Sequence, residues 1–325
     1  MRSIQGKNIL VTGGAGFIGS HLVDELLAKG AKKVVVVDNL FVGKLDNLQE
    51  AMDKYDNIEF YKDDASDLGT MTAICEKEQI DVIYNMATMA LIYSFFNPYT
   101  AYMVNVKLAE TLMHLLKAGK YKTLIHMSSS EAYGTAQYTP MDENHPMNPT
   151  TPYAAGKAAA DLLIKSFCNV YDLDVVIIRP FNNYGPRQND LALAAIIPLT
   201  AKKISENESP VIEGDGEQTR DFVFVKDTVK GLILAYETEG IRGEIINLGT
   251  GVELKIKDLI DGICKYYNYK GKIERKPERT ADVRRLCACS KKAKEKLGFE
   301  PEYSFEEGIK ITLDWYTKKN ARKDK

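Results

Sequence analysis

The stretch Asn8–Ser20, NILVTGGAGFIGS, decides the fold of this 325-residue chain. It opens with an apolar run typical of a buried strand, and three glycines spaced three residues apart follow at once. Glycines at these positions let the backbone turn tightly into a helix and approach a pyrophosphate closely. The free amides at the start of that helix would then bind the phosphates. We therefore predict a strand, a turn and a helix that hold a dinucleotide through Gly13, Gly16, Phe17, Ile18 and Gly19.

The alternation of buried strand and helix continues through the first half of the chain. Strands are predicted at Asn8–Thr12, Val34–Asp38, Ile58–Lys62, Val82–Asn85, Thr123–Ser128 and Val175–Arg179. Helices are predicted between them at Phe17–Ala28, Thr70–Glu78, Pro98–Lys117 and Pro152–Tyr171. This rhythm is typical of an α/β fold with a Rossmann-type doubly wound parallel sheet. After Arg179 turns and mixed segments take over, which indicates a smaller C-terminal lobe with a soft boundary near Pro180.

The residues after the second and third strands indicate which dinucleotide is bound. Asp38 ends the second strand about twenty residues after the glycines, where a carboxylate accepts hydrogen bonds from the ribose hydroxyls and repels a 2′-phosphate. Asn39 follows it and supplies no cation, so NAD is favoured over NADP, although Lys44 lies close enough to leave that choice open. Asp64, followed by Ala65, is a candidate for contact with the adenine edge or an ordinary turn residue.

Tyr153 and Lys157 are the candidate catalytic pair. They stand four residues apart in TPYAAGKAAADLL, a segment expected to be helical, so their side chains share one face. We expect the lysine ammonium, together with the positive nicotinamide of the cofactor, to lower the pKa of the phenol and make it a base for a substrate hydroxyl as hydride leaves. This spacing is common by chance, but the fifth strand runs into LIHMSSSEAYG and places hydroxyls at the carboxyl edge of the sheet, where such folds bind ligands.

The composition excludes several other classes of protein. The 43 basic and 45 acidic residues nearly balance, and no basic block precedes the short tail that begins at Lys318, so nucleic acid is not an expected partner. No apolar run has membrane-spanning length. Five scattered cysteines suit a reducing compartment, and Cys287 and Cys289 form a lone C-x-C without a second ligand pair, so no metal is expected. We therefore expect a soluble, cytoplasmic protein with a small-molecule ligand.

Six motifs in order resemble the extended short-chain dehydrogenase/reductase family over nearly the whole chain: TGGAGFIGS, SSSEAYG, YAAGK, RPFNNYGPRQ, EGDGEQTRDFV and NLGTG. The resemblance points to the NAD-dependent nucleotide-sugar epimerases, dehydratases and decarboxylases, which oxidise the sugar at C4. It implies an NAD-binding domain over residues 1–180 and a mainly nucleotide-sugar-binding lobe over 181–325, with some elements returning to the first domain. It also implies a homodimer formed through Pro98–Lys117 and Pro152–Tyr171.

The same resemblance assigns further site residues. Ser129 is expected to bridge Tyr153 and the substrate oxygen, and Ala87 and Asn105 to lie near the cofactor. The expected nucleotide-sugar contacts are Ser94, Asn182, Pro198, Arg220, Arg279 and Asp282. Arginine suits a diphosphate because its planar fork donates two hydrogen bonds at once, although a structural ion pair is the alternative for both arginines.

Glu131 indicates which reaction follows the oxidation. It sits two residues beyond Ser129, where the 4,6-dehydratases that this chain resembles carry a Glu that removes the C5 proton. The sequence therefore favours a 4,6-dehydratase acting on a UDP-hexose or UDP-N-acetylhexosamine. Ser130 stands where many dehydratases carry an Asp, so the acid for the leaving hydroxyl is either Ser130 acting through water or Glu131 itself.

Three alternatives remain from the sequence. A UDP-sugar 4-epimerase shares the first step, and a UDP-glucuronate decarboxylase needs a cation for the C6 carboxylate, for which Arg284 and Arg285 are candidates. A scaffold or sensor that binds NAD without turnover would have no need for Ser129, Tyr153 and Lys157.

Overall fold

The structure is a computed structural model that describes residues 1–191 and 193–323. Within these residues a seven-stranded parallel sheet has the order β11-β6-β5-β4-β1-β2-β3. Its strands are β1 (Asn8–Thr12), β2 (Lys33–Val37), β3 (Ile58–Tyr61), β4 (Val82–Asn85), β5 (Thr123–Met127), β6 (Val175–Pro180) and β11 (Ile245–Leu248). The Rossmann-type sheet is confirmed, and each of the six predicted strands agrees to within one residue at either end.

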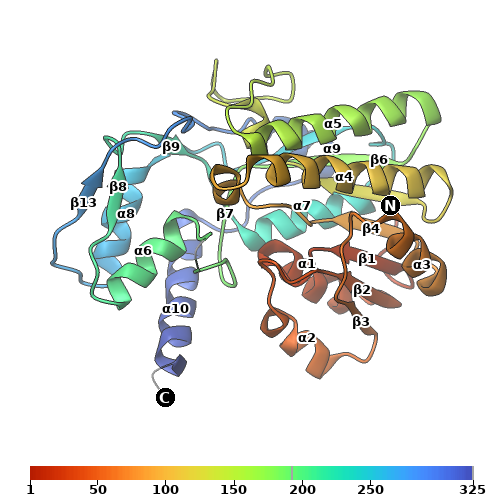
Figure 1. Ribbon diagram of the computed structural model, residues 1–325, viewed down its shortest axis with the longest axis horizontal. Helices are drawn as coiled ribbons and strands as arrows, with labels where there is room; N and C mark the ends of the chain where they lie inside the picture. The colour runs from red at the N-terminus through yellow and green to blue at the C-terminus, as the bar shows by residue number, and fades with distance from the viewer. Residues whose placement is uncertain (192, 324–325) are drawn as a thin grey trace.

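Helices cover both faces of this sheet (Figure 1). Successive residues of β1 point to opposite faces, so Ile9 and Val11 pack with one layer of helices and Leu10 with the other. The first layer contains α1 (Phe17–Ala28), α2 (Gln49–Lys54), α7 (Val225–Glu237) and α9 (Lys291–Leu297). The second contains α3 (Leu68–Glu78), α4 (Pro98–Lys117) and α5 (Pro152–Tyr171). The four predicted helices are confirmed; α3 begins two residues earlier than predicted because Asp67 caps it by accepting from the Thr70 amide at 2.7 Å.

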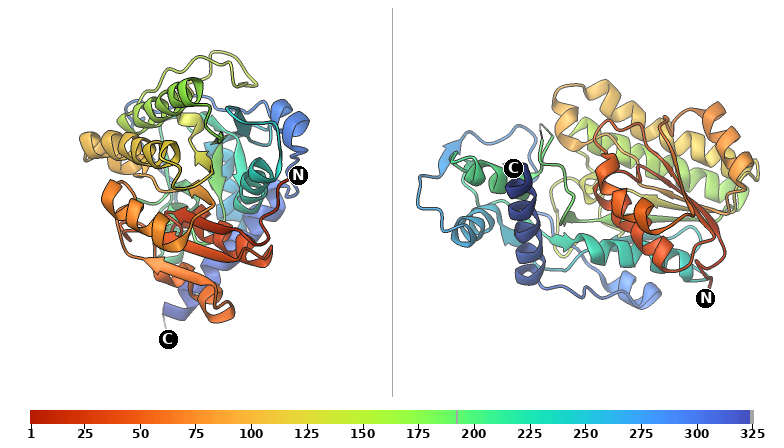
Figure 2. Two further views of the ribbon diagram at one scale, coloured as in Figure 1. Left: turned by 90° about the vertical axis from the view of Figure 1, so that its right-hand side faces the viewer. Right: turned by 90° about the horizontal axis from the view of Figure 1, so that it is seen from below.

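The second lobe lies beside the sheet lobe in Figure 1 and in the right-hand view of Figure 2. Its core is formed by α6 (Ile196–Ser205), α8 (Ile256–Tyr266) and α10 (Phe305–Lys323), which pack around aromatic residues such as Tyr184 and Phe224. Short strand pairs frame it: β8 (Val211–Glu213) with β13 (Glu274–Lys276), β9 (Thr219–Arg220) with β12 (Leu254–Lys255), and β7 (Asn182–Tyr184) with β10 (Phe222–Phe224). The domain boundary near residue 180 stays a prediction.

One buried carboxylate connects three of the segments that follow β6. Asp221 is 0% exposed and accepts hydrogen bonds from Thr250 N at 2.9 Å, Thr250 Oγ1 at 2.6 Å, Gly251 N at 2.8 Å and Ala288 N at 3.0 Å. Four donors satisfy a buried carboxylate that would otherwise be costly. Asp221, the second aspartate of EGDGEQTRDF, thereby fixes the last two residues of NLGTG, and both motifs have a structural role beside any role in binding.

Candidate active site

The glycine turn after β1 lies directly against the end of β4. Gly13 has φ +65°, and a Cβ built on it would stand 2.7 Å from the Cα of Ala87. A Cβ on Gly19 would stand 2.3 Å from the carbonyl oxygen of Gly13. Both positions exclude any larger residue, so the turn can bring its backbone close to a ligand. Gly16 caps α1 without a side-chain hydrogen bond, which leaves the first amides of the helix available.

A cavity of about 290 Å³ opens above this turn. It is lined by ten of the predicted cofactor residues: Gly13, Gly16, Phe17, Ile18, Gly19, Asp38, Asn39, Asp64, Ala65 and Ala87. Asn105 is not among the described lining residues; it is 2% exposed, and its amide donates to the Ala101 carbonyl at 2.8 Å. Asp64 accepts from the Ser66 amide at 2.8 Å, so it is a turn residue and also faces the cavity.

Asp38 is held firmly at the rim of this cavity. One carboxylate oxygen accepts from the Leu40 amide at 2.8 Å and the other from the Ala15 amide at 3.0 Å. Burial raises the pKa of Asp38, and these two hydrogen bonds oppose the rise. Each oxygen keeps a lone pair for a ribose hydroxyl. The close backbone, the uncapped helix start and the fixed carboxylate together fit a dinucleotide.

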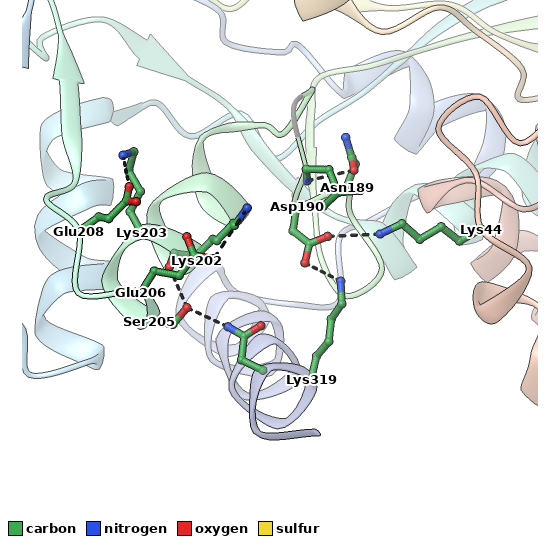
Figure 3. Close-up of polar contacts among 11 residues, drawn as sticks. Lys44, Asn189, Asp190, Lys202, Lys203, Ser205, Glu206, Glu208 and Lys319 are labelled. Atoms are coloured by element: carbon green, nitrogen blue, oxygen red, sulfur yellow. Dashed lines mark hydrogen bonds and ion pairs between the residues drawn. The ribbon is translucent and has the colours of Figure 1, made fainter. Parts of the chain in front are cut away.

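Lys44, the cation that left the choice of dinucleotide open, is engaged elsewhere. Its ammonium lies 3.4 Å from Asp190, which also pairs with Lys319 of α10 at 2.6 Å. Figure 3 shows Asp190 between these two lysines. The negative charge of Asp190 offsets the positive charge of Lys44, which would otherwise attract the 2′-phosphate of NADP.

Tyr153 stands in the first turn of α5, which Thr151 caps by accepting from the Ala154 amide at 3.2 Å. Two hydroxyl groups act on its own hydroxyl, those of Ser129, which follows β5, and of Thr88, which follows β4. Burial raises the pKa of Tyr153 to about 12, and the two hydroxyls oppose that rise. Lys157 is not among the causes that shift this pKa, so the part of the expected lowering assigned to the lysine is not found.

The environment of Lys157 explains the difference. Its side chain is 2% exposed, and its ammonium donates to the Met127 carbonyl at 3.0 Å. Burial lowers the pKa of Lys157 to about 8, and the negative charge of Asp161 one turn along α5 opposes this. Asp161 itself accepts from Arg179 and from Ser128, each at 2.8 Å. The ammonium thus bonds to the end of the strand and interacts with a buried carboxylate, and burial is the largest influence on the pKa of the phenol.

Glu131 connects the catalytic hydroxyls to a second cavity. It belongs to the short helix η3 (Ser130–Tyr133), and its amide donates to the Ser129 hydroxyl oxygen at 3.2 Å. It lines a cavity of about 400 Å³ together with residues of the second lobe. Burial raises the pKa of Glu131, the charges of Arg220 and Arg279 lower it, and that of Asp282 raises it. Ser130 is 3% exposed and is not among the described residues that line either cavity.

Four of the six predicted substrate contacts line this second cavity: Asn182, Arg220, Arg279 and Asp282. Arg220 pairs with Asp282 at 2.8 Å and Arg279 with Glu213 at 2.5 Å, so each arginine is ion-paired and also faces the cavity. The side-chain oxygen of Asn182 is buried without a hydrogen-bond partner, as expected of an acceptor reserved for a ligand.

The other two predicted contacts are not among the described lining residues. Ser94 is 2% exposed and donates to the Leu91 carbonyl at 2.7 Å. Pro198 is buried within α6. In each case flanking apolar residues line the cavity instead: Leu91, Ile92, Ile197 and Leu199.

The sequence interpretation missed several residues of these cavities. Thr88 directly follows the predicted Ala87 and lines the first cavity. Gln188 lines both, and its buried amide oxygen lacks a partner, as does that of Gln218 in the second. The signal for Gln218 was its position two residues before Arg220 in EGDGEQTRDF, whereas nothing in the sequence marked Thr88.

Neither cation proposed for a sugar carboxylate is among the described residues that line the cavities. Arg284 pairs with Asp215 at 2.8 Å, and Arg285 pairs with Glu253 at 2.6 Å.

Within residues 1–191 and 193–323, no group of three or more His, Cys, Asp or Glu side chains is arranged to hold a metal ion. No helix in that part of the chain is long and apolar enough to cross a membrane.

Comparison with known proteins identifies close relatives over the whole site. Residues 10–312 match the family described as GDP-mannose 4,6 dehydratase. A putative UDP-glucose 4-epimerase of Methanocaldococcus jannaschii is 36% identical over 96% of this chain and 99% of that protein. The crystal structure of a Thermotoga maritima UDP-glucose 4-epimerase with UDP-glucose superposes with a TM-score of 0.90 at 34% identity, covering 96% of this chain and 99% of that one. That of a Streptomyces venezuelae dTDP-glucose 4,6-dehydratase with NAD bound has a TM-score of 0.91 at 30% identity, covering 97% and 98%.

Proposed function

Because the chain belongs to the GDP-mannose 4,6-dehydratase family of NAD-dependent nucleotide-sugar dehydratases and epimerases, we propose that it is an NAD-dependent nucleotide-sugar 4,6-dehydratase. Its proposed substrate is a UDP-hexose or a UDP-N-acetylhexosamine. The observation that carries the proposal is the position of Glu131, bonded through its amide to Ser129 and exposed to the second cavity. A carboxylate beside Ser129 can remove the C5 proton in an elimination, whereas epimerisation at C4 needs no base at C5.

The first cavity suits NAD. The glycine turn and the first amides of α1 would hold its pyrophosphate, and Asp38 would accept from its adenosine ribose. When bound, NAD supplies the acceptor for the hydride of C4 and the donor that returns it to C6. Asp38 and the Lys44–Asp190 pair support NAD over NADP.

Side chains of this protein carry out the proton transfers and hold the substrate. Tyr153 accepts the proton of the C4 hydroxyl, and Ser129 donates a hydrogen bond to the same oxygen. The ketone at C4 acidifies the C5 proton, which Glu131 removes while the C6 hydroxyl departs. Once hydride has been returned to C6, C5 takes a proton from solvent water to complete the product. Glu131 is also the proposed donor of the proton that leaves with the C6 hydroxyl, because it lines the second cavity, whereas Ser130 is 3% exposed. Arg220 and Arg279 hold the diphosphate.

A 4-epimerase is the second candidate, and the similarity to two UDP-glucose 4-epimerases favours it. It would use Tyr153, Ser129 and NAD in the same first step and then require the keto sugar to turn in the cavity. A decarboxylase has less support, because Arg284 and Arg285 are paired with Asp215 and Glu253 outside the cavity.

The mass of the product separates these reactions. We expect incubation with UDP-glucose or UDP-N-acetylglucosamine to give a product lighter by one water. Loss of carbon dioxide from UDP-glucuronate would indicate a decarboxylase, and a product of unchanged mass with a new configuration at C4 would indicate an epimerase.

Substitution of Glu131 tests its role in the same assay. We expect Glu131→Gln to lower dehydration by about a hundredfold or more, since a general base contributes on that order. The control is Glu253→Gln, which changes a carboxylate that pairs with Arg285 outside the described cavity lining. Full dehydration by Glu131→Gln would exclude the proposed role.

A further inference from the structure

Asp161 is a buried carboxylate that the proposed mechanism does not use. It stands one turn of α5 after Lys157 and about two turns after Tyr153, so the three side chains lie on one face of the helix. A charged group in such a place is costly unless its oxygens are satisfied. The groups that surround it therefore indicate what it does.

Two side chains of α5 are attached to three successive residues at the end of β5. Asp161 Oδ2 accepts from the Ser128 hydroxyl at 2.8 Å, and its other oxygen, Oδ1, lies 3.9 Å from Nε2 of His126. Between these residues, the carbonyl of Met127 accepts from the Lys157 ammonium at 3.0 Å. Because the contacts involve consecutive residues, they fix how far along β5 the helix lies.

Arg179 connects the next strand to the same carboxylate. Its Nε donates from β6 to Asp161 Oδ2 at 2.8 Å, and both side chains are buried. A buried ion pair adds little net stability, because the desolvation of two charges offsets their attraction. It does restrict geometry, since the carboxylate must keep its donors in place. The ion pair thus fixes Asp161 relative to β6 as well as β5.

Hydrogen bonds from the cofactor side determine the tautomer of His126. The Thr12 hydroxyl accepts from the Ala87 amide at 3.2 Å and donates to Asn85 Oδ1 at 2.7 Å. The amide nitrogen of Asn85 then donates to His126 Nδ1 at 3.0 Å. The reverse orientation of the Asn85 amide would leave the Thr12 proton without an acceptor among the described residues. It would also present an unprotonated Nε2 to the Asp161 carboxylate.

His126 is therefore neutral, with its proton on Nε2. Burial lowers the pKa of His126 well below its ordinary value, and the positive charges of Lys157 and Arg179 act in the same direction. His126 Nε2 and Asp161 Oδ1 are both buried without a hydrogen-bond partner among the described residues. The N–H group thus stands near the carboxylate oxygen that Ser128 and Arg179 leave free, and its positive end attracts that oxygen.

We propose that Asp161 is a positioning residue that sets where Tyr153 lies relative to Ser129. Tyr153 stands about 12 Å along α5 from Asp161, and an α-helix carries a displacement over this length as a rigid element. Ser129 directly follows the part of β5 to which Asp161 is attached. Both hydroxyls must reach one sugar oxygen, and a misplacement of about 1 Å can slow a reaction by about a hundredfold.

Asp161→Asn keeps the shape of the side chain and replaces one oxygen by an NH2 group. We expect C4 oxidation, followed as formation of reduced nicotinamide in a single turnover, to become about tenfold slower. KM for the nucleotide sugar should stay within about twofold, because the proposed contacts with the diphosphate are unchanged. The matched control is Asp227→Asn, which changes a buried carboxylate of α7 that accepts from the amides of Glu302 and Tyr303. It should lower the thermal midpoint and leave C4 oxidation at the wild-type rate.

The nitrogen-15 shifts of the His126 ring test the contact without turnover. The chain has four histidines, and the signals of His126 are assigned by comparison with His126→Gln. In the wild type we expect a protonated Nε2 and an unprotonated Nδ1. In Asp161→Asn the amide oxygen stays with Ser128 and Arg179, so the NH2 group faces the N–H of His126. Two donors then meet, and the Nε2 shift should change.

A second pair of variants serves if Asp161→Asn does not fold. The amide nitrogen of His126→Gln can donate from the place of Nε2, whereas His126→Leu has no donor, so C4 oxidation should be faster in His126→Gln. Equal rates in these two variants would overturn the proposal, as would a wild-type rate in Asp161→Asn. An unprotonated Nε2 in the wild type, or a loss in Asp161→Asn confined to the thermal midpoint, would also contradict it.

The inference rests on the proposed roles of Tyr153 and Ser129, which a dehydratase and an epimerase share, and it does not depend on Glu131. Failure of dehydration alone therefore leaves the result for Asp161 to be decided by C4 oxidation. If the wild type forms no reduced nicotinamide with any nucleotide sugar, the proposed function fails. The nitrogen-15 shifts of His126 still decide whether the contact with Asp161 exists.

Discussion

At the scale of single residues, the positions of the site residues could be predicted from the sequence more readily than their pKa values. The spacing of Tyr153 and Lys157 and the place of Glu131 after Ser129 could be read directly, and the structure puts Glu131 in the second cavity. The direction of the tyrosine pKa could not, because it depends on burial and on where the ammonium points. Thr88 was missed for a related reason: its partner Asn105 is distant in sequence, and only the fold brings the two together.

Glu131 should give the dehydration step its own pH dependence. Burial, the largest influence, raises the pKa of this carboxyl above its ordinary value, so a larger fraction is protonated in mildly acidic solution. A base must be ionised, and product formation should therefore fall as pH decreases through the raised pKa. We expect the midpoint of this acidic limb to lie above 4.5, the ordinary pKa of a glutamate side chain.

Two assays on one enzyme check this assignment. The acidic limb should appear in product formation measured by mass, and the same limb should be absent from single-turnover C4 oxidation, which does not use Glu131. In Glu131→Gln the residual dehydration should lose this limb. If it persists at the same pH in that variant, another group is responsible.

At the scale of elements, the best-predicted helices are those with local start signals. Pro98 and Pro152 each occupy the first turn of a helix, and the caps Asn97 and Thr151 accept from the amides of Thr100 and Ala154. The strand β11 lacked such a signal. It is a four-residue run among turns, and it becomes a strand by pairing with β6, far back in the chain.

The homodimer is predicted to form through the exposed surfaces of α4 and α5. These helices pack side by side in Figure 1 and expose large apolar side chains, with Tyr99 74% exposed, Leu162 55% and Val170 69%. Exposed apolar side chains on two neighbouring helices are consistent with an interface. We expect light scattering to give twice the chain mass of 36.4 kDa.

A charge on this surface should separate the subunits. Leu162→Asp places a carboxylate where the partner would bury it, so we expect it to shift the mass toward one chain at micromolar concentration. The matched control is Ile311→Asp on α10, a residue 39% exposed on another surface, which should leave the mass unchanged. A wild-type protein of single-chain mass would contradict the dimer.

At the scale of the whole molecule, the loop segment 187–190 contributes residues to both cavities of the site. Gln188 and Asn189 line the cofactor cavity, and Gln188 also lines the substrate cavity. The loop is attached on both sides: Arg187 pairs with Asp24 of α1 at 2.7 Å, and the Tyr316 hydroxyl of α10 donates to the Gln188 carbonyl at 2.7 Å. Motifs along the chain predicted both ligands, but contacts between such distant segments cannot be read from local sequence.

Asp190 joins the two sides through its paired lysines, Lys44 near the cofactor cavity and Lys319 on α10 (Figure 3). It is 4% exposed, and although burial alone would raise its pKa, Lys319 and Lys44 hold that pKa below its usual value. Asp190→Asn removes the charge shared by both lysines and should loosen the loop from both lobes. We expect NAD to dissociate about tenfold faster, equivalent to ~1.4 kcal/mol, in stopped-flow fluorescence. Glu206→Gln is the control, because it breaks an exposed pair with Lys202 that stays on one lobe. Equal NAD dissociation from wild type and Asp190→Asn would show that the other attachments suffice to hold the loop.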